Sequence, residues 1–145
     1  KVAIIRSPMI YGKGSKGNYR KISWLAKKTL FFPDINNQRS MLHIDNLCEF
    51  IRLIIKNNDT GFFFPQNKEY VKTSEMVRLI ANENHKKVIF TKIFNPLIRK
   101  LNNSSTLVSK VFGNLYYEKD LSVYKEEYNI RNFRESIHLS ESDRL

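Results

Sequence analysis

The sequence predicts an α/β fold, and three observations carry this prediction. Short apolar runs rich in β-branched residues alternate with amphipathic stretches of helical period, in the order βαβαβαβ, and further short helical pieces follow. The chain has 145 residues, which suffice for one domain with one core. Its composition, 41% hydrophobic and 27% charged, is not that of a disordered tail.

The first elements follow one another closely. Residues 2–5 are apolar, which predicts a strand buried on both faces of a parallel sheet. Pro8 breaks the strand, and a glycine-rich loop follows over 11–18. Residues 19–30 carry apolar side chains at helical spacing and predict an amphipathic helix. Residues 38–43 predict a short extended segment.

Two further helices are predicted in the middle of the chain. The first begins at Asp45, whose carboxylate can cap it by accepting backbone N–H bonds, and closes at 57–61. A brief strand is predicted at 61–65. The next helix is expected to be capped by Thr73 or Ser74. Its side chains expected to face the core are Met76, Val77, Ile80 and Ala81.

The last third is predicted to be mostly helical. Residues 88–94 predict a strand that Pro96 terminates. The tail from His138 is polar, so we expect it to fray. The predicted helical pieces are 97–102, 106–112, 121–128 and 133–137.

Basic residues exceed acidic ones, with 25 Lys and Arg against 14 Asp and Glu, for a net charge of +11. Such an excess suits nucleic acid, an acidic membrane or an anionic small substrate. The basic residues form no run of five or more, which disfavours specific nucleic-acid binding. Apolar runs are too short to cross a bilayer, and we expect no membrane partner. Cys48 is the only cysteine, which predicts no disulfide, packing as a small hydrophobe, and a cytoplasmic location.

The pattern Gly12-x-Gly14-x-x-Gly17 lies between a predicted strand and a helix, as a dinucleotide-binding fingerprint does. In such a fingerprint the first glycine directly follows the strand, whereas residues 7–11 intervene here. Asn18 stands where a Walker loop requires lysine. We therefore predict a flexible loop.

No catalytic constellation is complete within the chain. None of the seven tyrosines begins a Tyr-x-x-x-Lys, and there is no Gly-x-Ser-x-Gly. The three histidines are too far apart for a local metal motif, so we expect neither a catalytic nor a metal-binding residue. Arg39 is the most interesting cation, because a guanidinium at a strand end suits a bidentate phosphate contact. A surface ion pair explains Arg39 as well.

Two segments resemble the extended short-chain dehydrogenase/reductases, in the NAD-dependent nucleotide-sugar epimerase/dehydratase group that includes UDP-glucose 4-epimerase. Residues 2–12 are similar to the family's sixth strand and its R-P-x-x-(V/I)-Y-G turn, and residues 39–47 to its R-x-(F/M)-x-H-(V/I)-x-D-(L/V) segment. Weaker likeness continues over 61–81 and 124–137. The resemblance implies that 1–145 are the C-terminal part of a Rossmann-like enzyme: its last parallel strands and its mostly helical substrate-binding region. The N-terminal NAD-binding half, with the glycine-rich loop and the Tyr-x-x-x-Lys pair, would then be absent.

The resemblance also implies site residues for two ligands. The turn after the first strand would lie against the nicotinamide and the sugar, the arginine would grip the diphosphate, and the loop at 32–37 would border the nucleobase. The implied substrate-binding residues are Arg39, Met9, Phe32 and Pro33, and the implied cofactor-binding residues are Ser7 and Pro8. Many family members have Asn in place of Met9. The family's second phosphate-binding arginine has no match near 116–120.

The implied function is the nucleotide-sugar-binding half of an epimerase or dehydratase, most closely of the UDP-glucose/galactose 4-epimerase type. In that family a tyrosine removes a hydroxyl proton while NAD takes the hydride. We would expect a homodimeric full-length enzyme that supplies sugars for surface polysaccharide. The chain begins at Lys1 inside a predicted strand, so we also expect sequence upstream. The alternative is a non-catalytic α/β binding or partner module.

Overall fold

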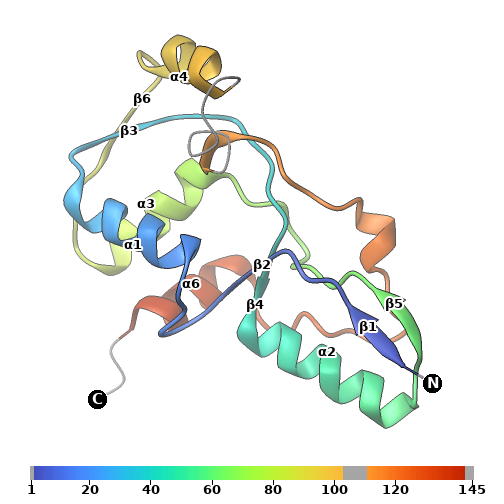
Figure 1. The fold of residues 1–145 in the computed structure, drawn as a ribbon. Coiled ribbons are helices and arrows are strands. Elements are labelled where there is room, and N and C mark those ends of the chain that lie inside the picture. Colours follow the sequence, from blue (N-terminus) through green and yellow to red (C-terminus); the bar gives the residue numbers. More distant parts are fainter. Residues whose placement is uncertain (1, 103–110, 143–145) are drawn as a thin grey trace.

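The computed structural model describes residues 2–102 and 111–142, and it confirms the α/β prediction (Figure 1). Strands and helices alternate, but the order differs in detail from the prediction, because the sequence pattern did not predict the strands Met9–Tyr11 and Phe31–Pro33. The elements are β1 (Ala3–Ile5), β2 (Met9–Tyr11), α1 (Asn18–Lys28), β3 (Phe31–Pro33), β4 (Met41–His43), α2 (Ile44–Asn57), β5 (Gly61–Phe63), α3 (Thr73–Glu83), β6 (Ile89–Thr91), α4 (Asn95–Asn102), the 3-10 helix η1 (Lys119–Ser122) and α6 (Phe133–Glu141).

The six described strands form three separate parallel pairs: β1 with β5, β2 with β4, and β3 with β6. The prediction that the first strand is buried on both faces is wrong for this structure. Ile4 is 42% exposed and Val2 is 71% exposed. The reason is that β1 has only β5 beside it among the described strands, and only one face of this pair packs on a helix.

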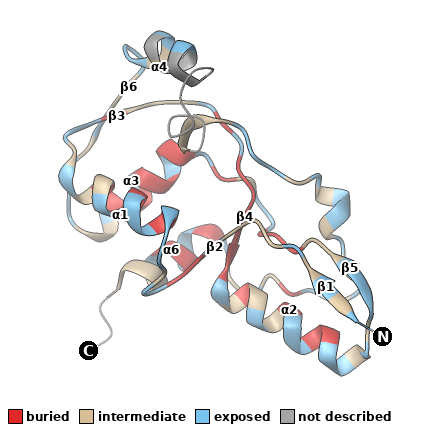
Figure 2. Cartoon of the chain, in the orientation of Figure 1, coloured by how far each residue is buried: buried red, intermediate tan, exposed pale blue. Residues whose placement is uncertain are grey.

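The side chains pack into two clusters. The larger joins α1, α3 and α6 to the inner side chains of β2 and β3, with Tyr11, Met76 and Ile137 fully buried. The smaller lies between α2 and the β1–β5 pair, where Phe50 contacts the rings of Phe63, Tyr124 and Tyr128. Figure 2 shows many of the buried residues on α3, α6 and β4, whereas β1, β5 and the β3–β6 end of the molecule are mostly intermediate or exposed. The predicted inward face of α3 is confirmed.

Helix α2 begins differently from the prediction. The cap is His43, whose Nδ1 accepts a hydrogen bond of 3.3 Å from the backbone N–H of Asp45. Asp45 lies within the first turn, where its negative charge interacts favourably with the positive end of the helix dipole. Its carboxylate also accepts a hydrogen bond of 3.2 Å from Arg131. The helix ends at Asn58, which adopts the left-handed conformation with φ of 50°.

The cap predicts a pH dependence of stability. Burial lowers the pKa of His43, the Asp45 carboxylate partly opposes this, and Arg131 adds to the lowering. A histidine whose pKa is lowered on folding contributes stability above its unfolded pKa of about 6.5, and this contribution is lost as the pH falls through the folded pKa. In His43→Asn the cap acceptor remains but does not titrate. The range from pH 7 to pH 5 brackets the ordinary pKa of histidine. Over this range we expect the melting temperature of His43→Asn to fall less than that of the parent.

The control for this experiment is His85→Asn, because His85 is exposed and asparagine tolerates its positive φ of 53°. The control should retain the pH slope of the parent. Equal slopes for the parent and His43→Asn would show that the imidazole cap does not titrate within this range.

The start of helix α3 is capped by a residue from an earlier part of the chain. Neither Thr73 nor Ser74 caps it: the cap position is Lys72, and no side chain of the helix start fills that role. Instead the Oδ1 atom of Asn37 accepts a hydrogen bond of 2.9 Å from the backbone N–H of Thr73. The Thr73 hydroxyl donates to the carbonyl of Val111 at 2.8 Å, which ties this helix end to the C-terminal third of the chain.

The three glycines of the 11–18 loop have structural roles. Gly14 and Gly17 have positive φ of 72° and 97°. Gly12 has no room for a side chain, because a Cβ atom there would lie 2.5 Å from Cγ2 of Ile44 at the start of α2. This close approach brings the loop onto α2.

Gly12→Ala should destabilise the fold by about 1–3 kcal/mol, because the branched Ile44 side chain is fixed close to its backbone and cannot yield without moving α2. Urea unfolding measures this loss. Gly14→Ala is the matched control: no atom lies within 4 Å of its Cβ position, and only the positive φ opposes the substitution. A loss for Gly12→Ala no larger than that of the control would mean that the contact with Ile44 relaxes freely.

The C-terminal region corrects several predictions. Of the helical piece predicted at 121–128, residues 121–122 belong to the 3-10 helix Lys119–Ser122, and 123–128 are not helical. Of the helical piece predicted at 106–112, residues 106–110 lie outside the described residues. Helix α6 continues to Glu141 because that carboxylate receives hydrogen bonds from Tyr19, Ser23 and Asn84 and an ion pair from Lys27, so the predicted fraying from His138 is wrong. Cys48 is exposed on α2, and it does not pack as a small hydrophobe.

Candidate functional site

A cavity of about 250 Å³ opens where the carboxyl end of β1 meets the start of β4. The ends of parallel strands are where ligands bind in open α/β sheets. Complete small-molecule sites occupy about 300–1,000 Å³, so this volume suits part of a ligand site. The lining residues are Ser7, Pro8, Met9, Arg39, Ser40, Leu115, Tyr116 and Tyr117. We call these residues the Arg39 cavity.

The backbone of Arg39 is held on both sides. Its N–H donates to the carbonyl of Val71 at 3.0 Å, and its own carbonyl accepts from the N–H of Val71 at 2.9 Å. The next residue, Ser40, donates its N–H to the carbonyl of Leu115 at 3.0 Å. These bonds join segments that are far apart in the sequence, and they position the guanidinium before any ligand arrives.

The Arg39 side chain is buried, with 4% of the residue exposed. Its Nη1 atom donates to the carbonyl of Gly113 at 3.2 Å. Among residues 2–102 and 111–142 it forms no ion pair, so the interpretation of Arg39 as a surface ion pair is wrong. Burial lowers the pKa of the guanidinium, but an arginine stays protonated in proteins. A buried positive charge without a carboxylate is costly, and an anionic ligand in the cavity would offset that cost.

The wall opposite the β1 turn is formed by 115–117 and is fixed by side-chain hydrogen bonds. The Ser40 hydroxyl accepts from the backbone N–H of Tyr117 at 2.9 Å and donates to Oε1 of Gln66 at 2.6 Å. Gln66 in turn donates to the carbonyl of Tyr117 at 3.2 Å. The Tyr116 ring packs on Tyr70 with centroids 5.2 Å apart. The cavity therefore has one cationic wall and one aromatic wall.

The structure brings together four of the six site residues expected from the sequence, namely Ser7, Pro8, Met9 and Arg39. It does not bring Phe32 and Pro33 to this cavity. The pairing of β3 with β6 directs the Phe32 ring inward, where it is 2% exposed and contacts Phe90 and Phe112. No base contact through Phe32 is available in this arrangement.

Sequence reasoning missed Ser40 and the 115–117 wall. The resemblance draws attention to 116–120 only for a second arginine, and none of the residues lining the cavity supplies one beside Arg39. The adjacent tyrosines were the available signal, but their position depends on contacts with Arg39 and Ser40 that have no local sequence pattern.

Tyr11 lies on the same strand as the cavity residue Met9, but it is not available for proton transfer. It is fully buried and hydrogen-bonded to Ser136 at 2.5 Å and to Asn67 at 2.9 Å. Burial raises its pKa to about 12, the opposite of what a tyrosine base requires. In the described part of the chain no three His, Cys, Asp or Glu side chains cluster as a metal site would require. No described helix is both long and apolar enough to cross a membrane.

Comparison with known proteins gives a consistent picture. No family model matches the chain. A UDP-glucose 4-epimerase from Vibrio cholerae is 33% identical over 85 residues, which are 55% of this chain and 26% of that protein. The solved UDP-glucose 4-epimerase of Thermus thermophilus, in complex with NAD, matches with a TM-score of 0.61 at 14% identity, over 94% of this chain and 44% of that one. The chain has part of the fold of the extended short-chain dehydrogenase/reductases.

A second solved structure supports the same fold. The UDP-glucuronic acid 4-epimerase of Bacillus cereus, in complex with NAD, matches with a TM-score of 0.57 at 13% identity, over 96% of this chain and 43% of that one. The likeness to extended short-chain dehydrogenase/reductases expected from residues 2–12 and 39–47 is thus confirmed. The chain spans about a quarter of the curated relative and less than half of these two solved enzymes.

Proposed function

We propose that this chain is the nucleotide-sugar-binding, C-terminal portion of an NAD-dependent epimerase or dehydratase, of the UDP-glucose/galactose 4-epimerase type. The observation that carries the proposal is the buried guanidinium of Arg39, which faces a cavity and has no carboxylate partner among the described residues. A diphosphate supplies the two negative charges and the planar arrays of acceptor oxygens that a guanidinium binds best.

The other residues of the Arg39 cavity fit roles around that contact. Ser7, Pro8 and Met9 form the wall at the end of β1, where the sugar would approach a nicotinamide. Tyr116 and Tyr117 form the aromatic wall, where apolar faces of the nucleotide would pack. In the proposed enzyme, Arg39 binds the diphosphate and the two walls orient the sugar.

The residues of this chain fit only the nicotinamide end of NAD. Ser7 and Pro8 can contact a nicotinamide, but Gly12 packs against Ile44 and is not placed to receive a pyrophosphate. NAD, when bound, accepts and returns a hydride. The epimerases of this fold were solved with NAD, which supports a nicotinamide cofactor for the proposed enzyme. Its main binding surface and the catalytic tyrosine would come from an N-terminal half.

Several finer expectations belong to the same proposal. The complete enzyme would be cytoplasmic and homodimeric, and it would supply sugars for surface polysaccharide. Because none of the tyrosines begins a Tyr-x-x-x-Lys, the proposed function gives this chain binding without turnover of its own.

The test is equilibrium binding of UDP, UDP-glucose and uridine to the chain, measured by calorimetry. The proposal expects UDP and UDP-glucose to bind and uridine, which lacks phosphate, to bind far more weakly. Equal binding of uridine and UDP would show that the diphosphate contributes nothing to binding. Binding of none of the three would overturn the proposal and favour the alternative, a non-catalytic α/β partner module.

A further inference from the structure

The β3–β6 pair and α4 form a lobe at the end of the molecule away from β1 and α2 (Figure 1). Phe31 and Ile89 are register partners on the two strands, and both point outward, with 56% and 57% exposure. Leu30 precedes β3 and is 69% exposed. Ile93 and Phe94 follow β6 and are 82% and 45% exposed. We call these five residues the apolar tip. None of them lines the Arg39 cavity.

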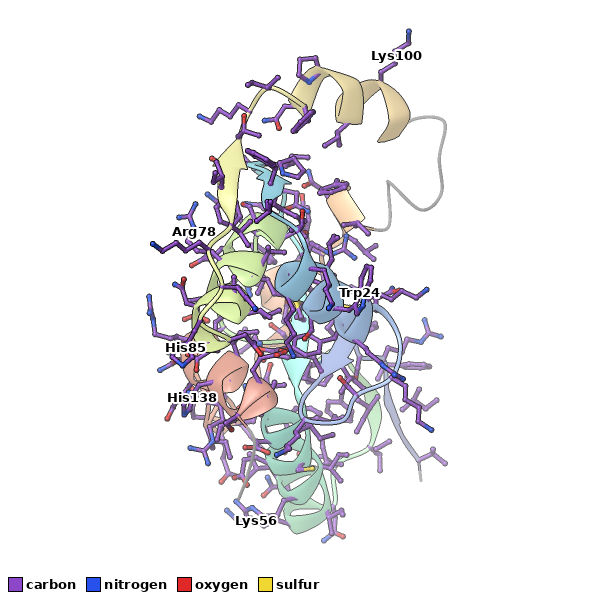
Figure 3. The ribbon with its side chains drawn as sticks, turned by 90° about the vertical axis from the view of Figure 1, so that its left-hand side faces the viewer. Trp24, Lys56, Arg78, His85, Lys100 and His138 are labelled. Carbon is purple, nitrogen blue, oxygen red and sulfur yellow. The ribbon has the colours of Figure 1, made fainter. Side chains whose placement is uncertain are left out.

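The surroundings of the apolar tip are strongly basic. Residues 84–102 contain five Lys or Arg and no Asp or Glu, and residues 18–33, which form α1 and lead through β3, contain no acidic residue either. Lys86 and Lys87 precede β6, Lys92 follows it, and all three are exposed. Lys100 stands at the far end of the lobe on α4 (Figure 3). Asp34, directly after β3, is the nearest acidic residue along the chain.

Single exposed apolar side chains are normal on a protein surface, but a group of them gathered on one lobe marks an interaction surface. The charge identifies the partner as anionic. Three of the five residues of the tip, Leu30, Ile89 and Ile93, are aliphatic, and such side chains cannot stack on nucleic-acid bases as aromatic ones do. Aliphatic and aromatic side chains surrounded by lysines are typical of surfaces that enter the interface of a bilayer.

We propose that the apolar tip docks this chain on an anionic lipid surface, with the surrounding lysines held at the headgroups. The tip would enter the headgroup region, and the lysines would be attracted by the negative surface potential. This peripheral contact requires no membrane-spanning segment, and the proposal differs from the sequence-based expectation of no membrane partner. It is independent of the nucleotide site, which lies elsewhere on the molecule.

The experiment is vesicle flotation with the purified chain, because floated vesicles separate from any aggregated protein. One set of vesicles is phosphatidylcholine alone, and the other is equal parts phosphatidylcholine and phosphatidylglycerol. We expect the chain to float only with the anionic vesicles and to be released by salt. Lys86→Ala with Lys87→Ala should lower the partition coefficient about 25-fold, at about fivefold for each basic residue near the surface. Phe31→Ser with Ile89→Ser should lower it without changing the net charge.

Matched controls lie on other surfaces. Lys56→Ala with Lys68→Ala removes the same charge from sites that pair with Glu126 and Glu127, and Ile55→Ser removes an apolar side chain that is 70% exposed on α2. Binding equal for both vesicles, absence of binding, or equal losses in the controls would overturn the proposal. Retention on single-stranded RNA that depends on Lys86 and Lys87, without vesicle binding, would assign the lobe to nucleic acid instead.

Discussion

Replacing Arg39 with alanine is expected to weaken UDP binding by roughly one to two orders of magnitude. A hydrogen bond to a charged group contributes about 1.5–3 kcal/mol, and in the Arg39 cavity the charge is already desolvated before the ligand arrives. Calorimetric titration with UDP measures the change. Arg39→Lys should recover only part of the affinity, because the ammonium lacks the planar fork of the guanidinium.

The same substitution gives a second, independent readout in stability. Arg39 donates one described side-chain hydrogen bond, to Gly113, and has no ion pair among the described residues. Removing its charge therefore relieves a desolvation cost, so Arg39→Ala should lose little or no stability on thermal unfolding while it loses UDP affinity. If Arg39 had a purely structural role, its replacement would lower the stability and leave the UDP affinity of the folded chain unchanged.

Arg52→Ala is the matched control for this prediction. Arg52 is exposed on α2 and pairs with Glu49 at 2.7 Å, so its loss should leave UDP affinity unchanged. If Arg39→Ala binds UDP as tightly as the parent, the Arg39 cavity is not the diphosphate site. If Arg39→Ala and Arg52→Ala weaken binding equally, the effect reflects overall charge and does not identify a site.

The sequence predicted the features that local pattern controls. The α/β alternation follows from apolar periodicity within each segment, and the positions of α1, α2 and α3 agree with it closely. Arg39 could be selected because its type and its position before a strand suit an anion. In each case the information lies within a few consecutive residues.

The failures come from contacts between distant segments. Glu141 looks like part of a polar tail in the sequence, yet its carboxylate is bound by Tyr19 and Ser23, more than a hundred positions earlier. The 115–117 wall is held by Ser40, 77 positions before Tyr117. His43 caps α2 through an imidazole, where the usual preference favours the nearby aspartate. No local period encodes such pairings.

The burial of β1 was mispredicted for a related reason, namely contacts that the described residues do not supply. The β1–β5 pair packs on α2 with one face, while Val2, Ile4 and Phe62 lie on the other face with 71%, 42% and 61% exposure. Ile4 and Phe62 are register partners, so they form a continuous apolar strip. Two-stranded parallel pairs are normally part of a larger sheet with both faces covered. In the proposed enzyme, strands and helices of an N-terminal half would cover this strip.

The isolated chain should therefore self-associate through this strip, and Ile4→Lys with Phe62→Lys should weaken that association at least about tenfold. Burial of one such side chain contributes about 1.5–3 kcal/mol, and a lysine on an open strand opposes pairing. Sedimentation velocity over a concentration series measures the association. Val123→Lys, at a residue that is 78% exposed elsewhere, should have no effect. A polypeptide carrying the N-terminal, NAD-binding half of an extended short-chain dehydrogenase/reductase should bind the parent chain and suppress its self-association. A parent chain that stays monomeric at every concentration and ignores that half would favour an independent binding module over the C-terminal portion of an enzyme.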